Sequence, residues 1–450
     1  MLNREKLEQS IGSCETEYDV LVAGGGPAGF GAALAASLSG ARTVLLESRS
    51  FLGGVAGTSL WMPINRLKIN GGTRGGVHAR LVEKLESFGG LACRPGKTTW
   101  TDGDGLHVHP DYLKLSMLEL LEECGCSYRL NSPAVGALVR NGSVAGVRIH
   151  TKEGIETFRS WVVIDCTGDG DVCFAAGARF EKGRPGDGVM MPVTLGFALA
   201  NVDTDKLFRF YDEQHCEESM RHWIEMAEAD GYTVSPWYSF DRTTVPGLVS
   251  VNNGGMKGIG KLCATDPRQS TLAERAGIRL AVDFVSFARK YRIPGLENCY
   301  LDRTGAAVGV RETRRVVCDY MLTLEDAQQN TRFPDPVAKR YGAVDQAGLS
   351  SQESGQRVTM ASGHAFPLRA LMVSGLDNLM AAGRCGSYTH MALAAGKSMG
   401  NMMAIGQAAG AAAACACRQA KPIREVPYAD VREALRALGV PVSDEEGVNW

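Results

Sequence analysis

The 450-residue sequence lacks the cysteine spacing of a metal-binding knuckle or a dithiol redox centre. Its thirteen cysteines are scattered, and no pair forms a CxxC motif. A zinc knuckle and a disulfide reductase that depend on this spacing are therefore disfavoured. The first seventeen residues are polar and lack the apolar segment of a signal peptide. We expect a reduced, cytoplasmic protein with mostly buried thiols and no metal site.

The sequence also lacks a strong excess of charge and a long, strongly apolar run. The formal net charge is -2, and no basic stripe is present, which argues against a nucleic-acid partner. The stretch Met391–Ala416 is apolar, but Lys397, Asn401 and Gln407 interrupt it and its residues are small. A membrane helix needs about 20 strongly apolar residues. We therefore predict a tightly packed internal helix and no membrane partner.

No internal repeat is present, but a glycine-rich motif lies near the start of the chain. Residues 18–23 read as a buried strand, 30–39 as a helix, and 43–46 as a second strand. Gly24, Gly26 and Gly29 form GxGxxG at the first turn of this unit. In such motifs the first glycine makes the tight turn, the second admits a pyrophosphate, and the third allows close helix packing.

The residues around this motif also suit a dinucleotide. Pro27 and Ala28 lie in this turn, just before the predicted helix, whose N-terminal amides can bind phosphate. Glu47 lies 23 positions after Gly24 (47 − 24), at the end of the second strand, and Ser48 follows it. A carboxylate there can accept the hydroxyls of an adenosine ribose, which argues against a 2′-phosphorylated cofactor. The motif by itself does not distinguish NAD from FAD.

Later motifs make that distinction through a family resemblance. They are RSFLGGVAG after Glu47, WVVIDCTGDGD, GVRETRRVVCDYMLTLEDA, and AGRCGSYTH followed by GQAAG. With GGGPAG, they resemble the FAD-dependent oxidoreductases of the glutathione-reductase/fumarate-reductase superfamily over about residues 17–440. The resemblance implies an α/β fold: a Rossmann-like, GR2-type FAD-binding domain with a three-layer parallel-sheet core, plus an inserted α+β substrate domain.

The resemblance also implies roles for individual residues. Glu47 would bind the adenosine ribose, and main-chain groups of Val135 would contact the adenine. Gly383 and Arg384 would approach the ribityl chain and pyrophosphate, and a helix beginning near Gly400 would cover the flavin ring. No histidine matches the covalent attachment site of fumarate reductases, so FAD is expected to bind non-covalently. The implied cofactor residues are Gly24, Gly26, Pro27, Ala28, Gly29, Glu47, Ser48, Gly53, Gly54, Val135, Thr167, Gly168, Asp169, Gly383, Arg384, Gly400 and Met403.

The same reading divides the chain into four segments. A polar extension covers residues 1–16, and the FAD-binding domain covers 17–188 and returns at 365–450. The inserted substrate domain would occupy 189–364. Single helices are predicted at 107–125, 205–231 and 270–291 from apolar residues at helical spacing.

Candidate catalytic residues are His390, His364, Arg314 and Tyr388. An arginine could anchor a carboxylate or polarise a carbonyl, while a histidine or tyrosine moves a proton. The alternative is structural: the arginines would form an ion-pair network between domains, and the histidines would be satisfied core groups.

The resulting hypothesis is an FAD-dependent oxidoreductase that moves a hydride between a small organic substrate and FAD. No second GxGxxG follows a strand, so a built-in NAD(P)H site is not expected. The electron acceptor would be oxygen, a carrier protein or a second small molecule, and a homo-oligomer is possible. Three alternatives remain: a redox-neutral isomerisation or hydration, an RNA-modifying flavoprotein, and a plain NAD dehydrogenase.

Overall fold

The structure is a computed structural model. It describes residues 4–61, 63–69, 72–96, 105–213, 217–257, 259, 262–342 and 363–442.

Seven strands form the central sheet: β1 (Glu17–Ala23), β2 (Thr43–Leu46), β8 (Ser127–Arg129), β9 (Ala134–Arg140), β10 (Ser143–Thr151), β11 (Gly154–Asp165) and β20 (Leu379–Ala381). Their order is β8–β2–β1–β11–β10–β9, and β20 pairs with the end of β11. β8, β2, β1, β11 and β20 are parallel, whereas β9 and β10 continue the sheet antiparallel. Ala23 pairs with Asp165, so the loops that follow β1 and β11 meet at one edge.

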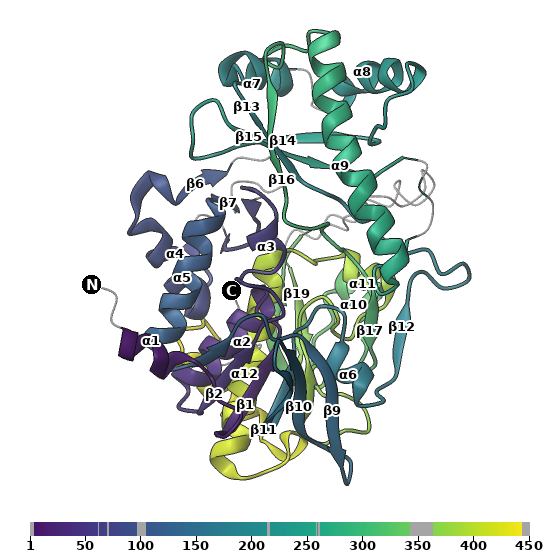
Figure 1. Cartoon of the computed structure of the whole chain (residues 1–450). Helices are drawn as coiled ribbons and strands as arrows, with labels where there is room; N and C mark the ends of the chain where they lie inside the picture. Colours follow the sequence, from purple (N-terminus) through teal and green to yellow (C-terminus); the bar gives the residue numbers. More distant parts are fainter. Residues whose placement is uncertain are drawn as a thin grey trace.

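The two faces of this sheet are covered differently. Val20 and Val22 of β1 pack in a core with α2 (Pro27–Leu38) and α12 (Met399–Gln419). Leu21, on the opposite face, packs in a second core with Val147 and Phe158 from β10 and β11. Because strand side chains alternate between faces, β1 is buried on both sides. Helices, the parallel strands and the antiparallel meander form three layers, which confirms the predicted Rossmann-like class (Figure 1).

The stretch expected to form one internal helix is divided into α11 (His390–Ala394) and α12. Between them Gly396 has a φ of +125°, a conformation that helices do not contain. The backbones of α12 and α2 are in direct contact. A Cβ on Gly406 would lie 1.9 Å from Ala28 O, and one on Gly410 would lie 2.1 Å from Ala32 O. Within the described residues, no helix has both the length and the apolar character to cross a membrane.

A second unit has its own sheet and core, and lies at the top of Figure 1. Its antiparallel strands follow the order β14–β15–β13–β16. Its core includes Phe197, Tyr238, Phe284 and Phe287. The region predicted as one helix at 205–231 is two helices, α7 and α8. The elements are β13 (Phe197–Ala200), α7 (Thr204–Glu213), α8 (Glu217–Ala229), β14 (Tyr238–Arg242), β15 (Val249–Asn253), α9 (Pro267–Lys290) and β16 (Tyr300–Thr304).

Two small antiparallel ladders belong to the first unit, and one of them lies where the chain leaves that unit and returns to it. β12 (Phe180–Lys182) pairs with β17 (Arg314–Val316), and β18 (Pro336–Arg340) pairs with β19 (His364–Pro367). Val316 and Val337 already pack in the cores of the first unit, although the sequence placed them in the inserted domain. The boundary predicted at 364/365 falls inside β19.

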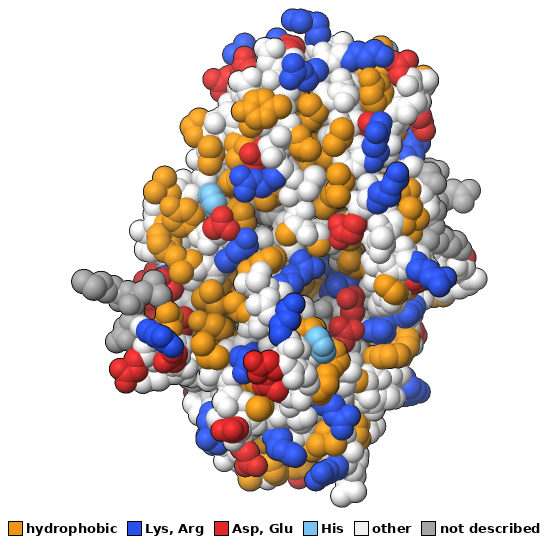
Figure 2. All heavy atoms as spheres, in the orientation of Figure 1, with side chains coloured by type: hydrophobic (Ala, Val, Ile, Leu, Met, Phe, Trp, Pro, Cys, Tyr) orange, Lys and Arg blue, Asp and Glu red, His pale blue; other side chains and the backbone are white. Residues whose placement is uncertain are grey.

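The remaining helices and strands surround these units. α5 begins at Pro110 rather than at the predicted residue 107, because His107 and Val108 belong to β7. On the face seen in Figure 2, basic and acidic side chains are interspersed. The other elements are α1 (Arg4–Ser10), α3 (Val55–Thr58), β3 (Pro63–Ile64), β4 (Lys68–Ile69), β5 (Gly72–Thr73), α4 (Gly76–Glu86), β6 (Cys93–Gly96), β7 (Gly105–Val108), α5 (Pro110–Glu123), α6 (Asp171–Ala175), α10 (Leu324–Gln329) and α13 (Tyr428–Ala437).

Candidate functional site

The glycine-rich turn after β1 has the conformation that its sequence predicts. Gly24 has a φ of +98°, and a Cβ there would lie 2.4 Å from Cys166 O. Gly29 approaches the turn so closely that a Cβ would lie 1.7 Å from Gly24 O. The expected roles of the first and third glycines in turn formation and packing are therefore confirmed.

Gly26 differs from these two glycines because it borders open space. A Cβ at Gly26 would meet no heavy atom closer than Gly54 Cα, at 3.8 Å. Gly26 is also the N-cap of α2, and no described side chain caps this helix end. Helix N-terminal amides without a cap attract anions, and a glycine lets a pyrophosphate approach the backbone. This end of α2 therefore has the space and the donors for phosphate.

Two further glycine turns meet the same helix end. Gly53 has a φ of +107°, and its amide donates to Gly25 O at 2.8 Å. Gly383, which follows β20, has a φ of +92°, and a Cβ there would lie 2.8 Å from Ala28 Cβ. The loops after β1, β2 and β20 thus converge at the carboxyl edge of the sheet, where α/β folds bind ligands.

Glu47 lies at the base of this turn and is 5% exposed. Its Oε2 accepts from the Gly25 amide at 2.5 Å, and its Oε1 accepts from Ser48 Oγ at 2.9 Å. The Ser132 amide donates to Glu47 O at 2.8 Å, which brings the start of β9, with Val135, beside Glu47. The Val135 side chain is exposed. The amides at the start of α2 can donate to phosphate, Glu47 is a carboxylate at the position expected for a ribose, and β9 begins beside it. This arrangement fits a dinucleotide.

The loop after β11 is held by Asp165 and by an ion pair. Asp165 Oδ1 accepts from the Thr167 amide at 3.0 Å and from its hydroxyl at 2.7 Å. Asp169 Oδ1 lies 2.9 Å from Arg384 Nη1 and accepts from Thr313 Oγ1 at 2.6 Å. Burial opposes ionisation of Asp169, but Arg384, the Thr313 hydroxyl and Arg314 together hold the pKa of this carboxyl below its usual value. This ion pair fixes the loop containing Gly168 against the loop containing Gly383.

A buried acid–histidine pair lies at the start of α11. His390 is the first residue of that helix, whose N-cap, Thr389, accepts from the Ala392 amide. His390 Nδ1 lies 2.9 Å from Glu312 Oε2, and both side chains are at most 1% exposed. Arg315 also contacts the Glu312 carboxylate and donates to Tyr388 O at 2.9 Å. The carboxylate therefore orients one ring nitrogen of His390.

Four neighbouring side chains carry buried polar atoms with no partner in the described part of the chain. These atoms are His390 Nε2, Tyr388 Oη, both ring nitrogens of His364, and Nε and Nη1 of Arg340. The Arg340 guanidinium carbon lies 4.6 Å from the Tyr388 ring centre, and the Tyr388 and Phe366 rings are 5.8 Å apart. Burial lowers the pKa of His364 to about 2, with a further contribution from Arg340. Buried polar groups normally have hydrogen-bond partners, so these atoms could bond a ligand.

The comparison with known families shows to which family the chain belongs. A family model described as FAD dependent oxidoreductase matches residues 19–435. The chain belongs to this family. It is therefore an FAD-dependent oxidoreductase, and FAD is its cofactor. No curated protein matches the sequence significantly.

Three solved structures to which the chain is similar are a halogenase, a reductase-like protein and a monooxygenase. The myxobacterial chondrochloren halogenase, an FAD-dependent halogenase, has a TM-score of 0.50 and 14% identity over 94% of this chain and 79% of its own. A geranylgeranyl bacteriochlorophyll reductase-like protein from Thermoplasma acidophilum has a TM-score of 0.46 and 16% identity over 94% and 86%. The p-nitrophenol 4-monooxygenase of Pseudomonas putida has a TM-score of 0.47 and 14% identity over 94% and 84%. At 14% identity the likeness to the halogenase shows the fold alone.

Arg314 is the one catalytic candidate that the structure does not bring into the buried cluster of this oxidoreductase. Its Nη1 donates to Asp169 O at 2.8 Å and pairs with Asp171 Oδ1 at 2.9 Å. Its guanidinium carbon also lies 4.3 Å from the centre of the Phe174 ring. A structural role accounts for these contacts, and a catalytic role for Arg314 stays a prediction.

The start of α12 packs against protein rather than open space. Gly400 donates its amide to Asn65 O at 3.0 Å, and a Cβ there would lie 2.2 Å from Arg66 O. A Cβ on Gly31 of α2 would lie 2.5 Å from Met403 O. The small residues of α12 are thus explained by its contact with α2, and the cofactor roles of Gly400 and Met403 stay predictions.

Arg340 is the residue of the cluster that the sequence did not reveal. It lies in KRYG, outside every motif of the family resemblance. Its neighbours become evident only when β18 pairs with β19, because Arg340 is then the register partner of His364. The available signal was an arginine ending a short apolar strand, which alone does not indicate a site.

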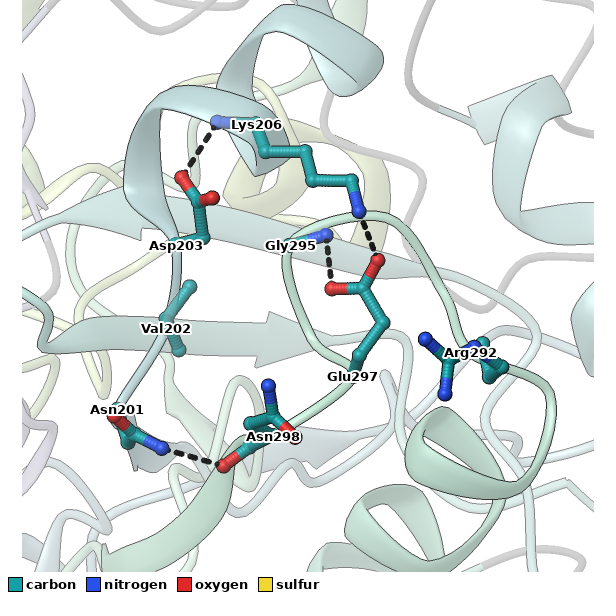
Figure 3. A pocket seen from close by; sticks show the side chains of 8 residues that line it. All are labelled: Asn201, Val202, Asp203, Lys206, Arg292, Gly295, Glu297 and Asn298. Carbon is teal, nitrogen blue, oxygen red and sulfur yellow. Dashed lines mark hydrogen bonds and ion pairs between the residues drawn. The ribbon is translucent and has the colours of Figure 1, made fainter.

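Two cavities in the described part of the chain lie away from these residues. One, of about 380 Å³, is lined by polar side chains of the second unit. In Figure 3 its Glu297 carboxylate bonds both Lys206 and the Gly295 amide, so the wall satisfies its own polar groups. A second, of about 180 Å³, is lined mainly by residues 242–248. Neither contains a predicted site residue, and no group of His, Cys, Asp or Glu in the described ranges could hold a metal.

Proposed function

We propose that this oxidoreductase moves a hydride between a small organic substrate and non-covalently bound FAD, with His390 as the proton donor or acceptor. FAD, when bound, supplies the hydride acceptor or donor. The first part of the proposal concerns where the cofactor binds. Gly26 and the N-terminus of α2 would hold its pyrophosphate, and Glu47 its ribose, because one offers open backbone and the other a buried carboxylate.

The state of His390 is the single observation that carries the catalytic proposal. One ring nitrogen is held by the Glu312 carboxylate, and the other, Nε2, has no partner among the described residues. A histidine oriented in this way can exchange a proton through the second nitrogen. Oxidation of a hydroxyl- or amine-bearing carbon releases one hydride and one proton, and His390 Nε2 would take the proton. In the reverse direction it would return it.

Glu312 and Arg315 act on this histidine indirectly. The Glu312 carboxylate fixes the orientation of the His390 ring through Nδ1 and leaves Nε2 for the substrate. Arg315 compensates the buried charge of Glu312 and ties it to the main chain at Tyr388 and at Gly183. Both are positioning residues, and neither needs to touch the substrate.

Cofactor placement can be tested with two glycine variants. Gly26→Ala should fold normally, because Gly26 has a φ of -70° and its Cβ would meet only Gly54 Cα at 3.8 Å. It should nevertheless lower FAD affinity at least about tenfold, since the methyl group occupies the phosphate approach. Gly90→Ala is the control, because a Cβ there meets no atom within 4 Å. Equal FAD affinity in the two variants, measured by flavin fluorescence, would contradict the placement.

The redox proposal is tested by mixing holoprotein with hydroxy acids, sugars and amino acids in the absence of oxygen. At least one compound should bleach the flavin absorbance permanently. His390→Gln should slow bleaching by about 10²–10⁴-fold while retaining FAD, which is the usual contribution of a general acid–base. His150→Gln is the control, since His150 is exposed on β10. Product formation without lasting bleaching would indicate redox-neutral chemistry, and undiminished bleaching in His390→Gln would reject the role of His390.

A further inference from the structure

Among the residues that the structure describes, three arginines are fully buried: Arg340, Arg74 and Arg315. Arg340 ends β18, and across the β18–β19 ladder its partner is His364, the first residue of β19. Its guanidinium also lies over the Tyr388 ring, at 4.6 Å from the ring centre. Arg340, His364 and Tyr388 therefore meet from three separate segments. We refer to these three residues as the Arg340 cluster.

The Arg340 cluster has more hydrogen-bond donors than the described protein uses. A guanidinium has five N–H groups. Nη2 donates to Ala392 O at 2.9 Å, whereas Nε and Nη1 have no partner in the described ranges. Nη2 has two N–H groups, one parallel to Nε–H and the other parallel to an N–H of Nη1. Whichever of them donates to Ala392 O, the other still forms a parallel pair that can bind a ligand. The Tyr388 hydroxyl and both nitrogens of His364 also have no described partner.

No carboxylate in the described ranges compensates the charge of the Arg340 cluster. No carboxylate in the described part of the chain pairs with Arg340, whereas Arg315 contacts both Glu312 and Glu181. Burial lowers the pKa of Arg340 to about 10, which leaves it charged at neutral pH. His364 is neutral there, because burial lowers its pKa to about 2. A buried cation without a counterion is unfavourable, so one monoanion would complete the cluster.

Gly396 allows the loop between α11 and α12 to pass close to the buried guanidinium. It has a φ of +125°, and a Cβ there would lie 3.2 Å from both Nε and Nη2 of Arg340. Any other residue would be strained in this conformation and would crowd the N–H groups that have no partner. The loop between α11 and α12 thus passes close to Arg340 without adding a side chain.

We infer that the Arg340 cluster binds a carboxylate of the substrate, so that the substrate is a small carboxylic acid. This inference rests on the proposed function, because it names the substrate class of the same site. A planar carboxylate accepts two parallel N–H groups from a guanidinium fork. Tyr388 and neutral His364 each supply one more donor. A phosphate dianion suits the site less well, because the described cluster offers a single positive charge.

The inference is tested with holoprotein and pairs of compounds that differ in charge alone. Acetate, oxalate, succinate and benzoate are compared with acetamide, oxamide, succinamide and benzamide, and binding is followed by the change in the flavin visible spectrum. At least one carboxylate should bind saturably, and its amide should bind at least tenfold more weakly. Arg340→Met should weaken that carboxylate at least a hundredfold and leave the amide unchanged.

The matched control is Arg369→Met, because Arg369 pairs with Asp335 at the protein surface and its side chain is 34% exposed. It should bind the carboxylate as the unmodified protein does. Equal binding of acid and amide by the unmodified protein would overturn the inference without requiring any variant. A shift of the flavin reduction potential in Arg340→Met, with the preference for the carboxylate intact, would also overturn it and place Arg340 against the flavin ring.

Failure of this inference differs from failure of the proposed function. If neutral compounds bleach the flavin and no carboxylate binds, the carboxylate site is rejected and hydride transfer stands. If carboxylates bind with the expected preference and no compound bleaches the flavin, hydride transfer is rejected and the carboxylate site stands.

Discussion

The glycine turn that would hold FAD and the Arg340 cluster differ in how far the protein satisfies its own polar groups. At the turn, Glu47 accepts from Gly25 and Ser48, and Gly53 donates to Gly25 O. In the cluster, Arg340, His364 and Tyr388 all keep buried polar atoms without described partners. In the turn, these polar groups bond one another and only the side at Gly26 is open. In the cluster, several buried polar atoms have no hydrogen-bond partner among the described residues.

This difference separates two ways of making a binding site. A phosphate site needs only amides at a helix start and a glycine that leaves space, so it costs little in the absence of ligand. A buried cation with no counterion costs stability until its ligand arrives. Arg315 provides an internal reference, because it is equally buried but contacts Glu312, Glu181, Gly183 O and Tyr388 O.

The largest effect is expected from Arg315→Met. This change leaves the Glu312 carboxylate buried beside His390 without its cation, and breaking a buried pair costs about 3–5 kcal/mol. Urea unfolding of the holoprotein measures the loss. A loss of less than about 1 kcal/mol in the free energy of unfolding would show that Arg315 and Glu312 do not form the buried ion pair that the contacts indicate.

Gly29→Ala should be the next largest, at about 3 kcal/mol or more. Its Cβ would lie 1.7 Å from Gly24 O, so the turn itself must move. Thermal unfolding compares it with Gly26→Ala, which should keep the stability of the unmodified protein. Similar stability of the two variants would contradict the view that one side of the turn is packed and the other is open.

His364 should produce a pH effect of intermediate size. Its pKa is about 2 in the folded state, against about 6.5 when unfolded, so below pH 6.5 the unfolded chain binds a proton that the folded state excludes. Its contribution to stability is therefore lost as pH falls, at about 1.4 kcal/mol per pH unit. His364→Asn should remove this slope. The variant must be compared with the unmodified protein between pH 6.5 and 5, because His78 and His107 also have lowered pKa values.

The smallest effect on stability is expected from Arg340→Met. Arg340 has no counterion among the described residues, so replacing its buried charge by an apolar side chain should leave the free energy of unfolding unchanged or raise it by about 1 kcal/mol. Measurement by urea unfolding without added carboxylates avoids stabilisation by a ligand. A loss as large as that of Arg315→Met would show that the folded protein already compensates Arg340.

The geometry of the glycine turn could be predicted from sequence because it is local. The strand, turn, helix and second strand are contiguous, and the positive φ of Gly24 and the close approach of Gly29 follow from their places in GxGxxG. Helix limits were less accurate. The split of α11 from α12 depends on the conformation of Gly396, and the split of α7 from α8 interrupts a region read as one polar helix.

The sequence by itself determined the family, the cofactor and the position of the glycine turn, because these depend on residues within about thirty positions of one another or on contiguous motifs. Only the tertiary structure decided which candidates meet. His364 lies beside Arg340 because β18 and β19 pair in one register, and Tyr388 contacts the same guanidinium. Arg314 lies outside this cluster and pairs with Asp171. Such contacts depend on long-range packing, and no local periodicity in the chain encodes them.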